Sequence, residues 1–398
     1  MAESNPNIVT ELKSLVGGFV SVKDKFIDAV SHSLTELKQM DQLLVTISKD
    51  TDTITAKQLK ALSDASFPAA GKYGSAASEY LNALQQMNQA GYKYSGEMAE
   101  LNLLTQNVSD MTGKLAAQYL SASDTIFQYG GSVRELNALL DGQNQVTNRN
   151  SISFSELASS ISAAGSALSG LPEEKATALL GTGISASGKS GEEVGRAVRG
   201  ILLNLQKGQG ASFGDIIDEN QLKRVEKRCR SLGIELKTLR NGAVKLRDPI
   251  KILEELAKAY NSLPESSPKR QGILTDIGGG QAEILDSILS NWDKYEKMTG
   301  DFSNSAGSAM AESAKVSESW EGSLNRLSNT WTDTVENVIN SDAVVSGINR
   351  LNDLLSVINN ITGALGSWGS IGAGIGAFLG AKNLGRHKSV SHIHCLLF

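Results

Sequence analysis

Proline is scarce in this chain, and this scarcity constrains the fold more than any other feature of the sequence. Only six prolines occur among 398 residues. Because proline removes a helical hydrogen bond and clashes with the preceding turn, so low a content permits long helices. A disordered chain would be richer in proline and in charge, and an all-β chain would have more than 5 % aromatic residues. The 39 glycines, with many serines and alanines, predict helices that have small side chains.

Net charge and cysteine content exclude several classes of protein. The formal net charge of −5 provides no strong field for binding nucleic acid or an anionic surface. Cys229 and Cys395 form neither a disulfide framework nor a zinc pattern, so the chain is compatible with a reducing cytoplasm. Glu3 and Glu11 lie where a secretory signal peptide would have a cationic region, so we expect no such peptide.

Apolar residues recur at steps of three and four along four segments, which places each set on one side of a helix. The sets are Leu34, Leu37, Met40, Leu44 and Ile47; Leu101, Leu104, Val108, Met111 and Leu115; Trp320, Leu324, Leu327, Trp331, Val335 and Val338; and Val344, Ile348, Leu351, Leu355 and Ile358. The alternating rhythm of the second and fourth sets is typical of packed or coiled helices. For every set the simplest interpretation is packing in a core or between helices.

Helix boundaries can be placed at two further points. Ser155 followed by Glu156 predicts a helix start, because serine can cap the first amides. Pro172 before two glutamates predicts another, because proline suits the first turn and acids favour the positive end of the helix dipole.

Residues 234–247 break the helical pattern. Ile234, Leu236 and Thr238 alternate with charged or polar neighbours, and Asn241–Gly242 follows them. Both of these residues tolerate positive φ, so the pair is a strong hairpin signal. We predict a small β-hairpin within a mainly α, multi-helix core that has elongated helices. The basic segment before it, KRVEKRCR, is more simply a solvated helix face than a nucleic-acid patch, because it has no interleaved aromatic residues and no second basic cluster.

The region near the C-terminus has a different chemistry. Residues 354–381 contain no charged side chain, and residues 361–381 are long enough to span a bilayer as a helix. Gly372, Gly376 and Gly380 are four residues apart, a spacing that lets helices approach closely. We expect this segment to insert into a membrane conditionally. A permanent span and a buried or flexible segment are the alternatives, since its many glycines weaken the helix and lower its hydrophobicity.

Three motifs suggest chemistry without predicting a site. Residues 183–190 (GISASGKS) match the phosphate-loop pattern, in which Lys189 and Ser190 would contact phosphate and magnesium. A helix-like run precedes them instead of a strand, so we interpret them as a turn between helices. A second candidate is a metal site in the tail, whose possible ligands are His387, His392, His394 and Cys395. Their spacing is not a familiar pattern, and we predict no catalytic, cofactor-binding or metal residues.

The third motif, Trp320-Glu321-Gly322, matches the W-x-G signature of small secreted helical-hairpin proteins. Those chains are much shorter and have the motif in a central turn, whereas here it begins an apolar set.

Taken in order, six segments resemble the conserved core of bacteriophage tail tape measure proteins. They are residues 59–92, 139–168, 190–206, 233–257, 284–298 and 304–342. None of them is specific alone, but their order and spacing across residues 35–360 are. The phosphate-loop match falls in the turn before the third segment, which supports the turn interpretation.

The resemblance implies a structural, non-enzymatic virion-assembly protein of a tailed phage or prophage, without a cofactor. Such proteins are elongated and helical, and a few copies lie along the tail axis. They set tail length because the tube polymerises around them, and on infection apolar segments help the genome to cross the host membrane. The implied partners are the tail tube protein, tail assembly chaperones, further copies of the chain and the host membrane, with no specific nucleic-acid sequence. The implied locations are the tube lumen of the virion tail and, during assembly, the host cytoplasm.

We therefore expect five parts. These are an N-terminal helical segment at 1–50, a conserved helical core with the hairpin at 51–300, amphipathic or coiled helices at 301–360, a Gly-rich apolar membrane segment at 361–385 and a short tail at 386–398. Members of the family are usually longer, so we expect a truncated or frameshifted C-terminus. Two other hypotheses remain open: a membrane-active or secreted helical effector or pore-forming protein, suggested by residues 361–381, and a phosphate-loop nucleotidase.

Overall fold

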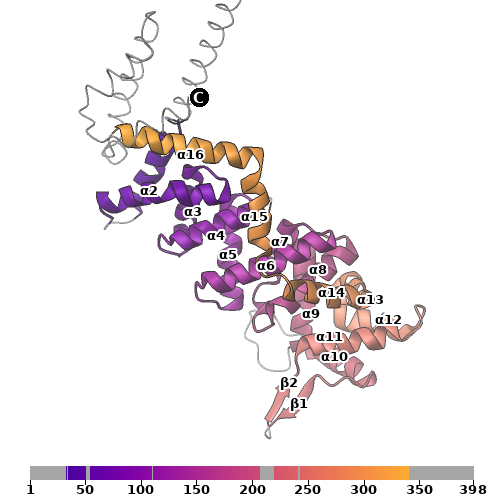
Figure 1. Ribbon diagram of the computed structural model, residues 1–398. Coiled ribbons are helices and arrows are strands. Elements are labelled where there is room, and N and C mark those ends of the chain that lie inside the picture. Colours follow the sequence, from indigo (N-terminus) through magenta and orange to yellow (C-terminus); the bar gives the residue numbers. More distant parts are fainter. Residues whose placement is uncertain are drawn as a thin grey trace, which may run out of the picture. The chain divides into compact units, whose positions relative to one another are not determined.

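The computed structural model describes residue 33 and residues 35–50, 54–109, 111–206, 219–240 and 243–339. These residues are mostly helical (Figure 1), which confirms the mainly α fold. The chain divides into two compact units, one formed by Leu62–Thr330 and the other by Met1–Ala61 with Trp331–Phe398. We call the first of these the central unit.

Several predictions fall outside the described residues. They concern the apolar set at 344–358, the apolar segment at 361–385 with Gly372, Gly376 and Gly380, and the tail at 386–398.

Fifteen labelled helices lie within the described residues. They are α2 (Ala56–Tyr73), α3 (Ala77–Gln89), α4 (Gly96–Val108), α5 (Gly113–Phe127), α6 (Val133–Asn150), α7 (Phe154–Ala164), α8 (Glu173–Ser187), α9 (Gly191–Gln206), α10 (Glu219–Ser231), α11 (Pro249–Asn261), α12 (Pro268–Ile273), α13 (Ala282–Ser290), α14 (Trp292–Ser303), α15 (Ser308–Glu318) and α16 (Trp320–Ile339). A further helical segment covers residues 35–49. Shorter turns are the 3-10 helix η1 (Gly165–Leu168), the π-helix η2 (Leu274–Gly278) and the 3-10 helix η3 (Gly279–Gln281).

The predicted hairpin is confirmed. Strands β1 (Lys237–Arg240) and β2 (Ala243–Leu246) pair antiparallel, with Lys237 opposite Leu246 and Arg240 opposite Ala243. This register leaves two residues between the strands, the connection length that Asn-Gly favours.

Serine caps the start of α7, but it is Ser153 and not the predicted Ser155. Ser153 Oγ accepts a hydrogen bond from the Glu156 backbone N–H (3.2 Å) and donates one to Glu156 Oε2 (3.2 Å). A cap accepts from the third residue of the helix, so the serine three positions before the glutamate takes this role. The start of α8 directly after Pro172 is confirmed.

The spacing of the apolar set at 101–115 predicts that it lies on one side of a helix, but the structure divides this set between two helices. α4 ends at Val108 and α5 begins at Gly113, where Thr112 Oγ1 accepts from the Leu115 N–H (3.5 Å). Leu101 and Leu104 are buried, whereas Leu115 is 52 % exposed. The three-four rhythm therefore spans a turn, because a polar cap interrupts the helix without changing the spacing.

The other two sets that can be assessed differ in burial. In the helical segment at 35–49, Leu37, Met40, Leu44 and Ile47 are all buried, as predicted. In α16, Leu324 and Leu327 are 46 % and 53 % exposed, so these two residues do not lie in a core of the described chain, and packing between helices stays a prediction for them.

Glycine allows α9 to lie directly against α7. A Cβ atom on Gly191 would collide with the Glu156 carbonyl oxygen, and one on Gly195 would collide with the carbonyl oxygen of Ser160. The two glycines are four residues apart, so they lie on the same face of α9. No larger residue fits this backbone-to-backbone contact.

Two glycine substitutions in α9 should have opposite effects on stability. Gly195→Ala should lower the free energy of unfolding by about 1–3 kcal/mol, because the added methyl overpacks the contact. Gly200→Ala should raise it by about 0.5–1 kcal/mol, because a Cβ at Gly200 meets nothing within 4 Å and alanine is the better helix former. Chemical denaturation of both variants measures this difference. Equal effects would contradict the close contact of α7 and α9.

Candidate functional site

The phosphate-loop match at residues 183–190 forms the end of one helix, a turn and the cap of the next helix. α8 continues to Ser187, and Gly188 ends it with a left-handed backbone (φ 66°). Gly183 lies inside α8, and Val194 occupies the position next to its missing Cβ. Because the segment is helical as far as Ser187, its N–H groups belong to a helix and not to an open loop.

The two side chains that would contact a nucleotide are paired within the protein. Ser190 Oγ accepts from the Glu193 backbone N–H (3.4 Å), and Glu193 Oε2 accepts from the Ser190 backbone N–H (3.2 Å), which forms a capping box at the start of α9. Ser190 Oγ also donates to Glu193 Oε2 (2.7 Å). These hydrogen bonds lower the pKa of the Glu193 carboxyl below its usual value. Lys189 Nζ lies 3.1 Å from Glu283 Oε2 on α13. The predicted turn between helices is confirmed.

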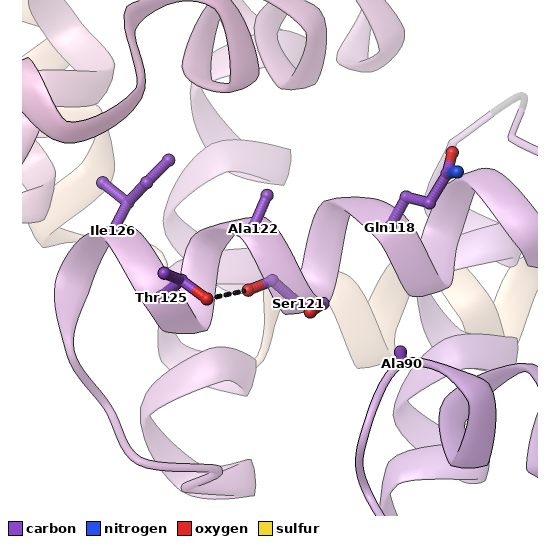
Figure 2. A pocket seen from close by; sticks show the side chains of 6 residues that line it. All are labelled: Ala90, Gln118, Ser121, Ala122, Thr125 and Ile126. Carbon is purple, nitrogen blue, oxygen red and sulfur yellow. Dashed lines mark hydrogen bonds between the residues drawn. The ribbon is translucent and has the colours of Figure 1, made fainter. Parts of the chain in front are cut away.

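An open groove of about 440 Å³ lies beside α5 (Figure 2). The residues lining it are Ala90, Gln118, Ser121, Ala122, Thr125 and Ile126. Thr125 Oγ1 donates to the Ser121 carbonyl (2.9 Å), so this hydroxyl is engaged within its own helix. No charged side chain lines the groove, which leaves it able to offer apolar contact and the amide of Gln118 but no acid or base.

Other reactive groups do not assemble into a site among the described residues. No group of three or more His, Cys, Asp and Glu side chains is placed to hold a metal ion there. Burial raises the pKa of the Cys229 thiol to about 12, so it stays protonated at neutral pH. The predicted tail ligands, His387, His392, His394 and Cys395, lie outside the described residues.

Among the described residues, no helix combines the length and the apolar character that a membrane crossing requires. The predicted apolar segment at 361–381 lies outside the described residues.

A buried carboxylate on α6 caps the start of α15. Asp141 is 6 % exposed. Its two carboxylate oxygens accept from the N–H groups of Gly307 (2.8 Å) and Ala309 (2.9 Å), and its carbonyl accepts from Ser308 Oγ (2.7 Å). Gly307 has no side chain with which to cap this helix, so the carboxylate supplies both the acceptor and a negative charge at the positive end of the helix dipole. We call this group the Asp141 clamp.

A second polar contact joins α16 to the turn between α2 and α3. Asn329 Nδ2 donates to the Ser75 carbonyl (2.7 Å), while its Oδ1 accepts from the Ala77 N–H (3.1 Å). Asn325 Nδ2 donates to the Gly74 carbonyl (2.9 Å). We call this contact the asparagine latch, because both asparagines satisfy backbone groups of one turn.

Glycine makes room for the asparagine latch. A Cβ on Gly74 would lie 2.8 Å from Ser317 Cα and 3.0 Å from Gly322 Cα. Gly322 is the glycine of the W-x-G match, and it lies in the first turn of α16 against the end of α15. The motif therefore forms a tight corner between two helices.

Asp301 on α14 ties that helix to the end of α6. Its carboxylate accepts from Arg149 Nη1 (3.2 Å) and from Asn150 Nδ2 (3.0 Å), and Lys297 Nζ lies 3.9 Å away. Like Asp141, it was not singled out from the sequence. The two acidic side chains are organising elements of the central unit, and neither lines the groove beside α5.

Comparison with known families identifies the region that these contacts organise. The family model described as "Phage-related minor tail protein" matches residues 56–279, which is more than half of the chain and extends from α2 to η3. No solved structure matches the chain.

The Asp141 clamp gives a graded prediction. Asp141→Ala leaves the N–H groups of Gly307 and Ala309 without their acceptor, so it should lower the free energy of unfolding by about 3 kcal/mol. Asp141→Asn keeps one acceptor oxygen and should cost about half as much. Chemical denaturation followed by circular dichroism measures both losses. Equal losses, or no loss for alanine, would contradict the clamp.

The turn at residues 188–190 gives a second prediction about stability. Ser190→Ala removes the cap of α9 and should cost about 1 kcal/mol of stability. Lys189→Ala removes an exposed ion pair and should change stability by less than about 0.5 kcal/mol. A nucleotide titration of the unchanged chain should show no binding. ATP binding that Lys189→Ala abolishes would restore the phosphate-loop interpretation.

Proposed function

Because the chain belongs to the family of phage-related minor tail proteins, we propose that it is a tail tape measure protein. In this proposal it acts as a helical template inside the tail tube and sets the length of the tail. The single observation that supports it most is the family match over residues 56–279, together with the helical character of the described residues.

The physical basis of the proposal is the constant rise of a helix. An α-helix rises about 1.5 Å per residue, so a fixed number of residues becomes a fixed length. Helix α16 extends without a break over 20 residues and suits this role. The central unit does not, because contacts such as the Asp141 clamp fold its helices back on one another. We therefore assign the measuring role to residues from Trp331 onward, which include the second half of α16.

The proposal includes partners and locations. The partners are the tail tube protein, tail assembly chaperones and further copies of the chain, and the locations are the tube lumen of the virion tail and the host cytoplasm during assembly. During infection, we propose that residues 361–381 contact the host membrane, because these residues are uncharged and glycine-rich. We also propose that the protein acts without catalysis and that no cofactor takes part.

The alternative of a membrane-active or secreted effector is not favoured, because the family match is to tail proteins. It would require residues 361–381 to act outside any virion.

The measuring role can be tested by changing the length of the chain in the parent phage. An insertion of about 28 residues of amphipathic helix after Ile339 should lengthen the tail by about 42 Å, since each residue adds about 1.5 Å. Electron microscopy of purified particles measures the tails. A control with Leu324→Ser and Leu327→Ser, which alters exposed residues but not chain length, should give tails of normal length. Unchanged tails after the insertion would refute the measuring role of this region.

A further inference from the structure

The segment formed by α10 and the hairpin has a charge opposite to that of the whole chain. Residues 223–247 contain nine lysines and arginines and two glutamates, while the chain has a net charge of −5. Figure 1 shows α10 and the two strands close together, and an ion pair between Glu226 Oε1 and Lys237 Nζ (3.0 Å) joins them. Positive charge is therefore concentrated at one place in the central unit.

Three acidic side chains near α10 and the hairpin are engaged with cations. Glu226 pairs with Lys237, and Asp276 of η2 pairs with Arg228 Nε (2.7 Å). On the far side of the hairpin, Arg247 Nη1 contacts Glu255 Oε2 (3.0 Å). These pairs fix the orientation of α10.

Three cations on α10 remain exposed. Lys223, Lys227 and Arg230 have exposed side chains, and no described carboxylate lies within 4.0 Å of any of them. At 100° per residue they fall within about 60° of one another around the helix, and along its axis they span about 10 Å. We call these residues the α10 cation row.

The opposite side of α10 anchors the row to the protein. Val225 and Cys229 are fully buried, and the Cys229 carbonyl accepts from the Ile234 N–H (2.9 Å), which fixes the chain at the end of the helix. The apolar side chains of α10 that the structure describes are thus used in the core. A helix that inserts into a membrane surface would need apolar side chains free to enter the lipid, so a bilayer is the less suitable partner.

We propose that the α10 cation row binds the phosphate backbone of double-stranded DNA, without regard to base sequence. A regular row of cations on a rigid helix complements a regular row of phosphates, and each cation that neutralises a phosphate releases a condensed counterion. Residues 219–247 contain no aromatic side chain, a lack that counts against binding of single strands but not against contact with duplex phosphates. Because binding of single strands relies on bases stacked on aromatic rings, the chemistry of this surface favours a duplex.

This proposal is independent of the measuring role. The row lies within the family-matched core at residues 56–279, whereas the measuring role is assigned to residues from Trp331 onward. Failure of either test leaves the other unaffected.

The proposal can be tested with the full chain and a short fluorescent duplex of random sequence. Fluorescence anisotropy over a series of salt concentrations should show binding that weakens steeply as salt rises. The triple variant Lys223→Glu, Lys227→Glu and Arg230→Glu should bind at least about tenfold more weakly. Its slope of log affinity against log salt should be shallower by about 2.7, because each phosphate that is no longer neutralised reduces the slope by about 0.9.

A matched control separates this surface from net charge. Lys57, Lys93 and Lys114 are exposed, and their replacement by glutamate changes the net charge of the chain equally. This control should keep most of the affinity. A milder variant with glutamine at the three α10 positions should also weaken binding, and circular dichroism checks that each variant is folded.

Three outcomes would overturn the proposal. They are no duplex binding by the unchanged chain, equal weakening in the α10 variant and the control, and binding to phosphatidylserine vesicles or to polyglutamate without binding to DNA. The last outcome would assign the α10 cation row to a membrane or to an acidic protein.

Discussion

The direct contact of the α7 and α9 backbones is the constraint on which the packing of the central unit depends. Gly191 and Gly195 allow it, because any side chain at these positions would meet the backbone of α7. α9 also packs against α8, α10 and α13, so its distance from α7 fixes its place among all of them. Dispersion forces weaken steeply with small increases in separation. In a chain with so many small side chains, close approach therefore replaces bulk as the source of packing.

Polar contacts then join parts of the chain that are far apart in the sequence. The Asp141 clamp connects positions 166 residues apart, and the asparagine latch connects positions 254 residues apart. Each satisfies backbone groups that a helix end or a turn leaves without partners. A buried polar group without a hydrogen-bond partner costs free energy, so these contacts favour one arrangement of the helices. Apolar contacts between alanine and leucine alone would define that arrangement less well.

The sequence predicted features whose causes are local and missed those whose causes are distant. The hairpin and the turn at residues 188–190 were predicted, because Asn241–Gly242 and Gly188 act within a few residues. The break after Val108 was missed, because the spacing of apolar residues is the same whether or not a polar residue caps a new helix between them. Asp141 could not be identified, since its partners lie on α15.

The glycine contact in α9 is an intermediate case. Gly191 and Gly195 have the same four-residue spacing that marked Gly372, Gly376 and Gly380, so a signal was present. The spacing alone does not show which helix faces these glycines. Only the fold shows that the partner of this glycine face is α7.

Length and compactness place opposite demands on a helical template. A residue adds about 1.5 Å to a template only when its helix runs along the axis that is measured. Within the central unit, the Asp141 clamp brings the start of α15 back to α6, so most of its residues add no length. A mutation that removes hydrogen bonds of the Asp141 clamp would reduce the stability of this unit without changing the number of residues in the chain. Under the proposed measuring role, stability should therefore depend on residues of the central unit, and measured length on residues from Trp331 onward.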